Sequence, residues 1–242
     1  GNNPSIFPHQ DETKPKISRQ GLATESKYII ECADKLGDQT FYHQYNCDFR
    51  YRIYPLSAFL HEQSSDRSKG IMLFDKGEAL GEDGLYWLMM HTANVWGEDK
   101  VSLDDRVQFV KDNFADWEEW AQDPINNTGW MAADKAWSFL AAIIELDNLQ
   151  YFDGEPEEYV CSLPLFIDGS NNGVQHMTAL TLDEKTAPLV NLVPQDIPGD
   201  VYMHICRAVY DVIDADYNPD LDGPFEEFMA QYKEMTESLV GL

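Results

Sequence analysis

The sequence predicts an α+β protein that is dominated by helices and carries a small antiparallel sheet. Most of the chain places apolar residues three or four positions apart, which is typical of helices. The stretch 40–59 is rich in aromatic and β-branched residues, and an apolar run at 163–167 ends in a polar, glycine-rich loop. Hydrophobic residues make up 43% of the 242 residues and aromatic residues 12%, so the chain can form a substantial core.

The N-terminal quarter of the chain predicts an arm, a helix and a strand. Residues 1–24 are polar and contain prolines, which indicates a flexible N-terminal arm. A helix is expected from Glu25 to Leu36, because its apolar residues share one face and Gly37 follows as a stop signal. The aromatic-rich stretch then predicts extended strand as far as Pro55.

Residues from about 80 to 150 predict a helical insertion. A helix is expected from about Glu82 to Val95, after a short strand and a glycine-marked turn. A second helix runs from Ser102 to Gln122, because Ser102 is a good N-cap and acidic residues follow it in the first turn. The stretch from Trp130 to Leu149 is apolar nearly all round, which is typical of a buried helix.

The C-terminal part of the chain predicts a strand followed by helices. A buried strand is expected at 163–167, ending at Asp168, and helices follow from about Val174 to Leu182 and from Asp200 to Tyr217. The second of these helices has one apolar side: Val201, Ile205, Val209, Val212 and Ile213. Residues 218–242 predict a helical tail.

The chain is strongly acidic, with 43 Asp and Glu against 17 Lys and Arg and a formal net charge of −26. This balance argues against broad, unaided binding to DNA or RNA, since phosphate contacts need Lys and Arg. It fits an acidic enzyme, a subunit that docks on a basic partner, or acidity that serves solubility alone. No apolar stretch is long enough to span a membrane, and the spacing of the four cysteines suggests neither zinc nor a disulfide framework.

The stretch SLPLFIDGSNNGVQH, residues 162–176, holds a carboxylate at the end of an apolar run. Asp168 in such a place can ligate Mg²⁺, and Gly169 would leave its carbonyl accessible as a second ligand. Gly173 begins the next helix, whose free N–H groups attract anions such as phosphate. An ordinary Asp-Gly turn with a helix cap at Asn171 or Asn172 explains the same residues, and both interpretations stay open at this point.

A second candidate site lies in the stretch YNCDFRYRIYP. In an extended strand Arg50, Arg52 and Tyr54 share one face, and Asp48 on that face could orient one of the arginines. Two guanidinium groups beside an aromatic ring suit phosphates and stacked bases, whereas a surface strand with an Asp–Arg pair is the alternative. Lys69 lies further on in the Ser-rich stretch QSSDRSKG, which is a weak signal for phosphate contact.

Taken in order, these stretches resemble the palm segment of the single-subunit, bacteriophage- and mitochondrial-type DNA-directed RNA polymerases. YNCDFRYRIY resembles the family's DxxGR element, which contacts the template and the RNA–DNA hybrid, and QSSDRSKG resembles its QGxDxxKG element. SLPLFIDGSNNGVQHMTAL resembles the motif that carries the first of two catalytic aspartates, and DEKTAPLVNLVPQDIPGDVY continues as the family does. The resemblance implies the helix-rich palm subdomain of a right-hand polymerase over residues 25–217, with the split before the fingers near 218–242.

The resemblance also implies roles for single residues. Asp168 would be catalytic as a Mg²⁺ ligand, Gly169 would offer its carbonyl to the metal, and Ser170, Asn172 and Gly173 would line the ribose of the incoming nucleotide. Four residues would contact nucleic acid: Arg50, Arg52, Tyr54 and Lys69. Three would give structural support: Asp48, Gln175 and His176.

The chain departs from the family pattern at two glycines. Tyr51 stands where Gly is expected before Arg52, and Ser64 where Gly is expected after Gln63, so a close backbone approach is in question at both points. Neither the KRxxMxxxYG helix of the family's fingers nor the HDS motif with the second catalytic aspartate is found in the sequence. Either the chain is a fragment of a longer polymerase, or a second chain supplies both.

The preferred hypothesis is the smaller subunit of a heterodimeric bacteriophage RNA polymerase, active only with a second subunit and sharing two Mg²⁺ ions with it. It would act on DNA template, RNA transcript and NTPs in the cytoplasm of the infected bacterial host, away from any membrane. A non-catalytic interaction subunit of a transcription complex is one alternative. A stand-alone acidic hydrolase that uses paired carboxylates such as Asp168 and Asp183 is another.

Overall fold

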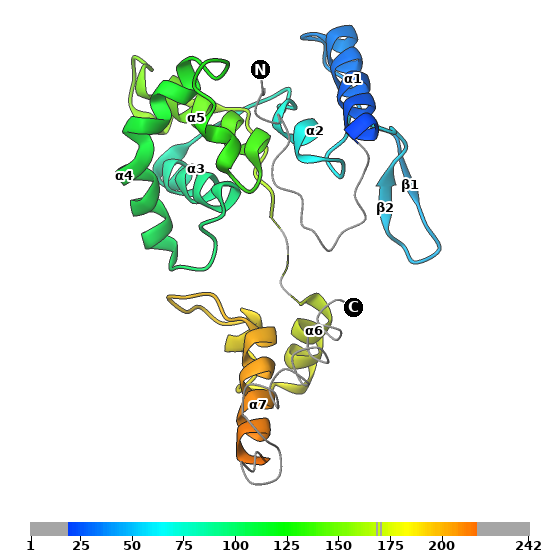
Figure 1. Ribbon diagram of the computed structural model, residues 1–242, viewed down its shortest axis with the longest axis vertical. Helices are drawn as coiled ribbons and strands as arrows, with labels where there is room; N and C mark the ends of the chain where they lie inside the picture. Colours follow the sequence, from blue (N-terminus) through cyan, green and yellow to red (C-terminus); the bar gives the residue numbers. More distant parts are fainter. Residues whose placement is uncertain (1–18, 168, 170, 217–242) are drawn as a thin grey trace. The chain divides into compact units, whose positions relative to one another are not determined.

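The structure is a computed structural model that describes residues 19–167, 169 and 171–216 (Figure 1). Contacts divide the chain into two compact units, residues 1–168 and 169–242, and each unit is described by itself. The expected N-terminal arm up to residue 18 and the expected tail at 218–242 lie outside the described residues. Within the described ranges, no helix combines the length and the apolarity that crossing a membrane requires.

Three helices form a bundle in the first unit, namely α3 (Gly81–Trp96), α4 (Leu103–Gln122) and α5 (Ala136–Gln150). They pack against one another and occupy the stretch at about 80–150 that the sequence assigned to a helical insertion (Figure 1). Their buried apolar faces, with neighbouring loops, form one cluster: Leu88, Ala93, Val95, Val110, Trp117, Trp130, Ala133, Ala136, Phe139, Ala142, Ile143, Leu146 and Leu163.

Aromatic rings fill the centre of that cluster. The rings of Trp117 and Phe139 meet edge to face with their centroids 4.9 Å apart. The ring of Trp96 lies 5.4 Å from that of Trp117 and 5.0 Å from that of Phe139. Each such pair adds about 0.5–1.5 kcal/mol beyond the burial of its apolar area, so this trio fixes how the three helices pack.

Local signals set the ends of the bundle helices. Ser102 caps α4 as predicted, since its hydroxyl accepts a hydrogen bond from the N–H of Asp105 at 3.2 Å. Gly97 ends α3 with a φ of 118°, a left-handed conformation that glycine adopts at least cost. α5 starts at Ala136 rather than at Trp130, because Trp130 lies in a separate 3-10 turn, η1 (Gly129–Ala132).

Two further helices lie beside the bundle. α2 (Asp66–Gly70) packs against α5, and α1 (Arg19–Leu36) packs against α2 (Figure 1). α1 begins at Arg19 rather than at the predicted Glu25, and it buries Leu22 and Ile29 on one side. The predicted end of this helix at Leu36 is confirmed.

The strands form two small antiparallel sheets, which confirms the α+β prediction. β1 (Tyr45–Cys47) pairs with β2 (Ile53–Pro55) as a hairpin, with Asn46 opposite Tyr54. β3 (Glu78–Ala79) pairs with β4 (Val160–Cys161), which follows the short 3-10 helix η2 (Pro156–Glu158).

The prediction of one extended strand up to Pro55 is wrong. Residues 48–52 form a tight turn, closed by a hydrogen bond from the N–H of Asp48 to the carbonyl of Arg52 at 2.9 Å. The sequence gives no signal for this turn, because its left-handed residue is Tyr51, whereas Gly or Asn is usual at such a position.

The prediction of a buried strand at 163–167 is also wrong. The backbone over these residues belongs to no strand, and only Leu163 among them is buried, whereas Ile167 is 95% exposed. Pro164 has no N–H to donate to a ladder, which ends the pairing of this segment with its neighbour after Ser162.

The second unit holds α6 (Asn172–Thr181), the 3-10 helix η3 (Pro188–Val190) and α7 (Val201–Asp216). Among its described residues, few are buried: Thr178, Val190, Val201 and Ile213. The predicted apolar side of α7 is therefore only partly buried, since Ile205, Val209 and Val212 remain exposed.

His91 is packed inside the first unit. Its exposed fraction is 5%, and its ring lies 6.2 Å from that of Phe166. Burial, together with the charge of Lys135, lowers the pKa of His91 from 6.5 to about 4. Between these two pH values the unfolded chain binds a proton on His91 that the folded chain excludes.

We therefore expect acidification from pH 6.5 to pH 4 to lower the free energy of unfolding through His91 by about 3 kcal/mol, since one pKa unit corresponds to about 1.36 kcal/mol. Urea unfolding at a series of pH values would measure this in the wild type and in His91→Gln, which cannot titrate. The wild type should lose more stability across the window. Parallel losses in the two proteins would contradict a buried, neutral His91.

Candidate functional site

The turn between β1 and β2 is organised by the carboxylate of Asp48. Its Oδ1 accepts hydrogen bonds from the N–H groups of Arg50 at 2.8 Å and Arg52 at 3.0 Å. Its Oδ2 accepts one from Nε of Arg50 at 3.2 Å. These bonds, the one from the Arg52 backbone first, lower the pKa of the Asp48 carboxyl. Asp48 thus shapes the turn and holds the guanidinium of Arg50.

The two arginines of the hairpin, Arg50 and Arg52, lie in the turn between its strands. Arg50 sits in the turn, so the expectation that Arg50 and Arg52 share a strand face is wrong. The expected Asp–Arg pair is present and involves Arg50, whose side chain stays 54% exposed. Tyr54 follows in β2 and is 39% exposed.

Asp66 joins α2 to the beginning of α5. Its Oδ2 accepts a hydrogen bond from the N–H of Trp137 at 2.7 Å, and its Oδ1 accepts from the N–H and the hydroxyl of Ser138 at 3.2 and 2.6 Å. A carboxylate at this position satisfies free N–H groups and meets the positive end of the α5 dipole. Asp66 therefore caps a helix that begins some seventy positions later in the chain.

Two other residues of α2 have structural partners. A Cβ on Gly70 would come within 2.6 Å of the backbone of Trp137, so only glycine lets α2 lie this close to α5. Arg67 donates to the carbonyl of Leu22 at 3.2 Å and to the hydroxyl of Ser26, which ties α2 to α1. The sequence reasoning missed Asp66 and Gly70, although both occupy fixed positions of the QGxDxxKG element.

Lys69 extends from α2 towards the segment that precedes Asp168. Its ammonium group lies 4.8 Å from the centroid of the Phe166 ring, a cation–π contact. Phe166 stands two positions before Asp168, while Asp168 itself and Ser170 lie outside the described residues. Lys69 is therefore placed next to the chain segment that carries the candidate metal ligand.

The described residues after Asp168 lead into α6. Asn171 caps the helix in a left-handed conformation, with φ of 59°. Gly169 is exposed, and a Cβ there would collide with the side-chain oxygen of Asn172. A Cβ on Gly173 would meet nothing within 4 Å, so packing inside the described residues does not require glycine at this position.

The remaining predicted residues of this unit lie further along α6 and in the loop that follows it. The side-chain amide of Gln175 donates to the carbonyl of Val190 at 2.7 Å, which links α6 to η3, and His176 is exposed. Asp183 accepts from the hydroxyl of Thr186 at 2.6 Å and from the N–H of Lys185 at 3.0 Å, and these bonds lower the pKa of its carboxyl. Asp183 thus caps its own loop.

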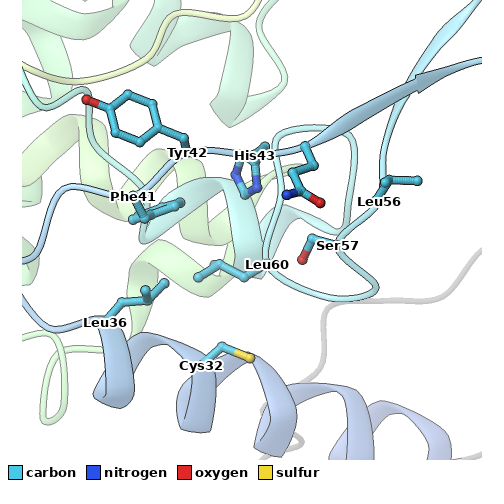
Figure 2. A pocket seen from close by; sticks show the side chains of 9 residues that line it. Cys32, Leu36, Phe41, Tyr42, His43, Leu56, Ser57 and Leu60 are labelled. Atoms are coloured by element: carbon cyan, nitrogen blue, oxygen red, sulfur yellow. The ribbon is translucent and has the colours of Figure 1, made fainter.

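A hollow of about 310 Å³ lies between the end of α1 and the two segments that flank the hairpin (Figure 2). It is lined mostly by apolar side chains: Cys32, Leu36, Phe41, Tyr42, His43, Gln44, Leu56, Ser57 and Leu60. None of the predicted site residues lines it, and its lining holds no arginine or lysine to receive a phosphate.

The donors that could hold a metal ion are few in the described part of the chain. No group of three His, Cys, Asp or Glu side chains lies close enough there to bind a metal, and Asp168 falls outside that part. The exposed Gly169 offers a carbonyl oxygen beside it, which is a donor type that Mg²⁺ accepts.

Comparison with known proteins covers most of the chain. A family described as DNA-dependent RNA polymerase matches residues 78–239. The chain is 40% identical over 206 residues to the mitochondrial DNA-directed RNA polymerase of Neurospora crassa, which covers 84% of the chain and 14% of that protein. It is 34% identical over 220 residues to T7 RNA polymerase of Escherichia phage T7, which covers 88% of the chain and 24% of that protein. The chain thus spans at most about a quarter of the length of these relatives.

We expect Asp66→Ala to lower the free energy of unfolding by about 2 kcal/mol, because it removes a charged helix cap and leaves two N–H groups of α5 without their acceptor. Asp66→Asn keeps one acceptor oxygen and should cost about half as much. Denaturant unfolding would measure both changes. Asp116→Ala is the matched control, because Asp116 is exposed on α4, and a loss equal to that of Asp66→Ala would contradict the capping role.

Proposed function

Because the chain belongs to the DNA-dependent RNA polymerase family, we propose that it forms part of the palm of a DNA-directed RNA polymerase and carries the first catalytic aspartate of nucleotidyl transfer. The observation that carries the proposal is the family match over residues 78–239, since it includes Asp168 and the start of α6. In this reaction the RNA 3′-hydroxyl attacks the α-phosphate of an NTP selected by the DNA template, and pyrophosphate leaves.

Asp168 and the carbonyl of Gly169 would hold Mg²⁺ in this proposal, because carboxylate and carbonyl oxygens are the ligands that this ion takes from proteins. Two such ions, when bound, neutralise charge on the attacking and leaving oxygens of an in-line displacement. The chain's own part is to place oxygen donors and to keep a path open for the nucleotide, since positioning accounts for most of the catalysis in such reactions.

The beginning of α6 suits the incoming nucleotide. Its free N–H groups attract anions, and the space beside Gly173 lets a ribose or phosphate approach the backbone. Ser170, Asn172 and Gly173 would line the ribose. Gln175 would brace this helix through its bond to Val190, with His176 beside it in the first turns.

The hairpin and α2 would hold nucleic acid. Arg50 and Arg52 at the hairpin tip and Lys69 on α2 are cations that can take phosphates of the template or transcript, and Tyr54 offers a ring for stacking. Asp48 would act through Arg50, because its carboxylate fixes that guanidinium. The chain carries a formal net charge of −26, so the binding of phosphates depends on these cations.

The fingers and the second catalytic carboxylate would come from a second polymerase subunit, with which this chain shares two Mg²⁺ ions. The chain matches at most about a quarter of each relative's length, and this supports the need for further polymerase segments. The acidity of this chain favours a more basic partner. With phage relatives among the matches, we place the assembly in the cytoplasm of an infected bacterial host.

Replacement of the candidate metal ligand tests the proposal. Asp168→Asn should reduce template-directed RNA synthesis by the assembled polymerase to background, because the amide cannot supply the negative charge that holds Mg²⁺. Co-purification of the partner should be unaffected. Asp183→Asn is the matched control and should keep synthesis, since Asp183 caps its own loop. Full activity of Asp168→Asn would leave a non-catalytic interaction subunit as the better account.

The substitution Gly173→Ala distinguishes an effect on stability from an effect on nucleotide binding. The added methyl group meets open space, and alanine favours a helix more than glycine does. The melting temperature should therefore stay the same or rise, and the free energy of unfolding should increase by at most about 1 kcal/mol. Synthesis should nevertheless fall, with a higher KM for the NTP, because the methyl group occupies the path of the ribose. An unchanged KM would remove Gly173 from the nucleotide site.

A further inference from the structure

Tyr51 adopts a backbone conformation that disfavours its side chain. Its φ is 61°, in the left-handed region that costs a bulky residue energy and that glycine enters freely. The family pattern has Gly at this position. Ser64 replaces the other expected Gly without such strain, since it is not among the described residues with positive φ. Of the two positions that depart from the family glycines, only Tyr51 carries this strain, although Asn171, Leu182 and Asn191 also have positive φ.

The turn, rather than the side chain, imposes this conformation. Asp48 accepts hydrogen bonds from the N–H groups on both sides of Tyr51, and the N–H of Tyr51 donates to the carbonyl of Asp48 at 3.0 Å. The ring of Tyr51 gains no burial in return, because the residue is 90% exposed. Strained residues that the surrounding structure holds in place cluster at binding and catalytic sites.

The neighbours of Tyr51 indicate what that role is. Phe49 is 91% exposed, and the guanidinium of Arg50 lies 5.6 Å from the centroid of its ring. The tip thus presents the exposed rings of Phe49 and Tyr51, with Arg50 between them and Arg52 after them. Residues 49–54 contain no Asp or Glu, although the chain has 43. Rings that stack on unpaired bases, set among cations that take phosphates, are the usual surface for single-stranded nucleic acid.

We propose that Tyr51 is a base-stacking residue, whose ring packs on an unpaired base while Arg50 and Arg52 hold the adjoining phosphates. The inference deepens the proposed function and rests on it, because it names the contact that this hairpin makes with single-stranded template. It also explains why a tyrosine occupies a position where glycine would fold at lower cost.

The test compares Tyr51→Gly, Tyr51→Ala and Tyr51→Phe in the assembled polymerase. Affinity for a fluorescein-labelled oligothymidylate is measured by anisotropy without Mg²⁺. Tyr51→Gly should raise the melting temperature of the chain and yet weaken binding about tenfold, within the range expected for the loss of one stacked base. Tyr51→Ala should weaken binding equally without a comparable gain in stability, and Tyr51→Phe should bind as the wild type does.

Salt dependence distinguishes stacking from charge. Tyr51→Gly should shift the plot of log affinity against log salt downwards without changing its slope, whereas Arg52→Ala should reduce the slope by about one phosphate contact. Wild-type affinity of Tyr51→Gly overturns the inference. So does dissociation of the polymerase by Tyr51→Gly, because the ring would then be a protein contact. If Asp168→Asn still abolishes synthesis in either case, the proposed function stands without this role of Tyr51.

Discussion

The hydrogen bonds of the Asp66 carboxylate to the first turn of α5 connect the two parts of the first unit. The helical bundle on one side contains the large apolar cluster, and the hairpin and α2 on the other side carry Arg50, Arg52 and Lys69. Gly70 packs against the same turn of α5, so the rotation of α2 about its own axis is fixed at two points. The direction of Lys69 follows from those two contacts, and its ammonium group reaches Phe166 for that reason. The contacts of Asp66 and Gly70 with α5 thus determine where the ammonium group of Lys69 lies.

The same use of carboxylates recurs through the candidate site. Asp48 accepts from the backbone of its turn, Asp66 from α5, and Asp183 from the loop that follows it. A carboxylate surrounded by N–H donors repels a nearby phosphate less than a free one does, because the donors offset part of its charge. In a chain with a net charge of −26, this arrangement supports the proposed role of Arg50, Arg52 and Lys69 in holding phosphates.

The sequence predicted the helices well, because periodic apolar residues and caps such as Ser102 act within one element. It failed at the strands, since a strand depends on neighbours that its own residues do not specify: Leu165 to Ile167 are apolar yet exposed and unpaired in the described chain. The hairpin turn was missed because Tyr51 occupies a position where glycine would have signalled it. The capping role of Asp66 could not be predicted from spacing, because its partners lie seventy positions away.

The glycine positions of the family pattern differ in the physical constraint that favours glycine. Gly70 is required by packing, since any side chain would meet the backbone of Trp137. The position of Tyr51 is governed by backbone conformation, and a side chain fits there at the cost of strain. Gly173 is constrained by neither, because open space surrounds it and its backbone is helical. Where fold and packing both permit a side chain, glycine leaves room for a molecule to approach the backbone from outside, and this supports the proposed nucleotide site at the start of α6.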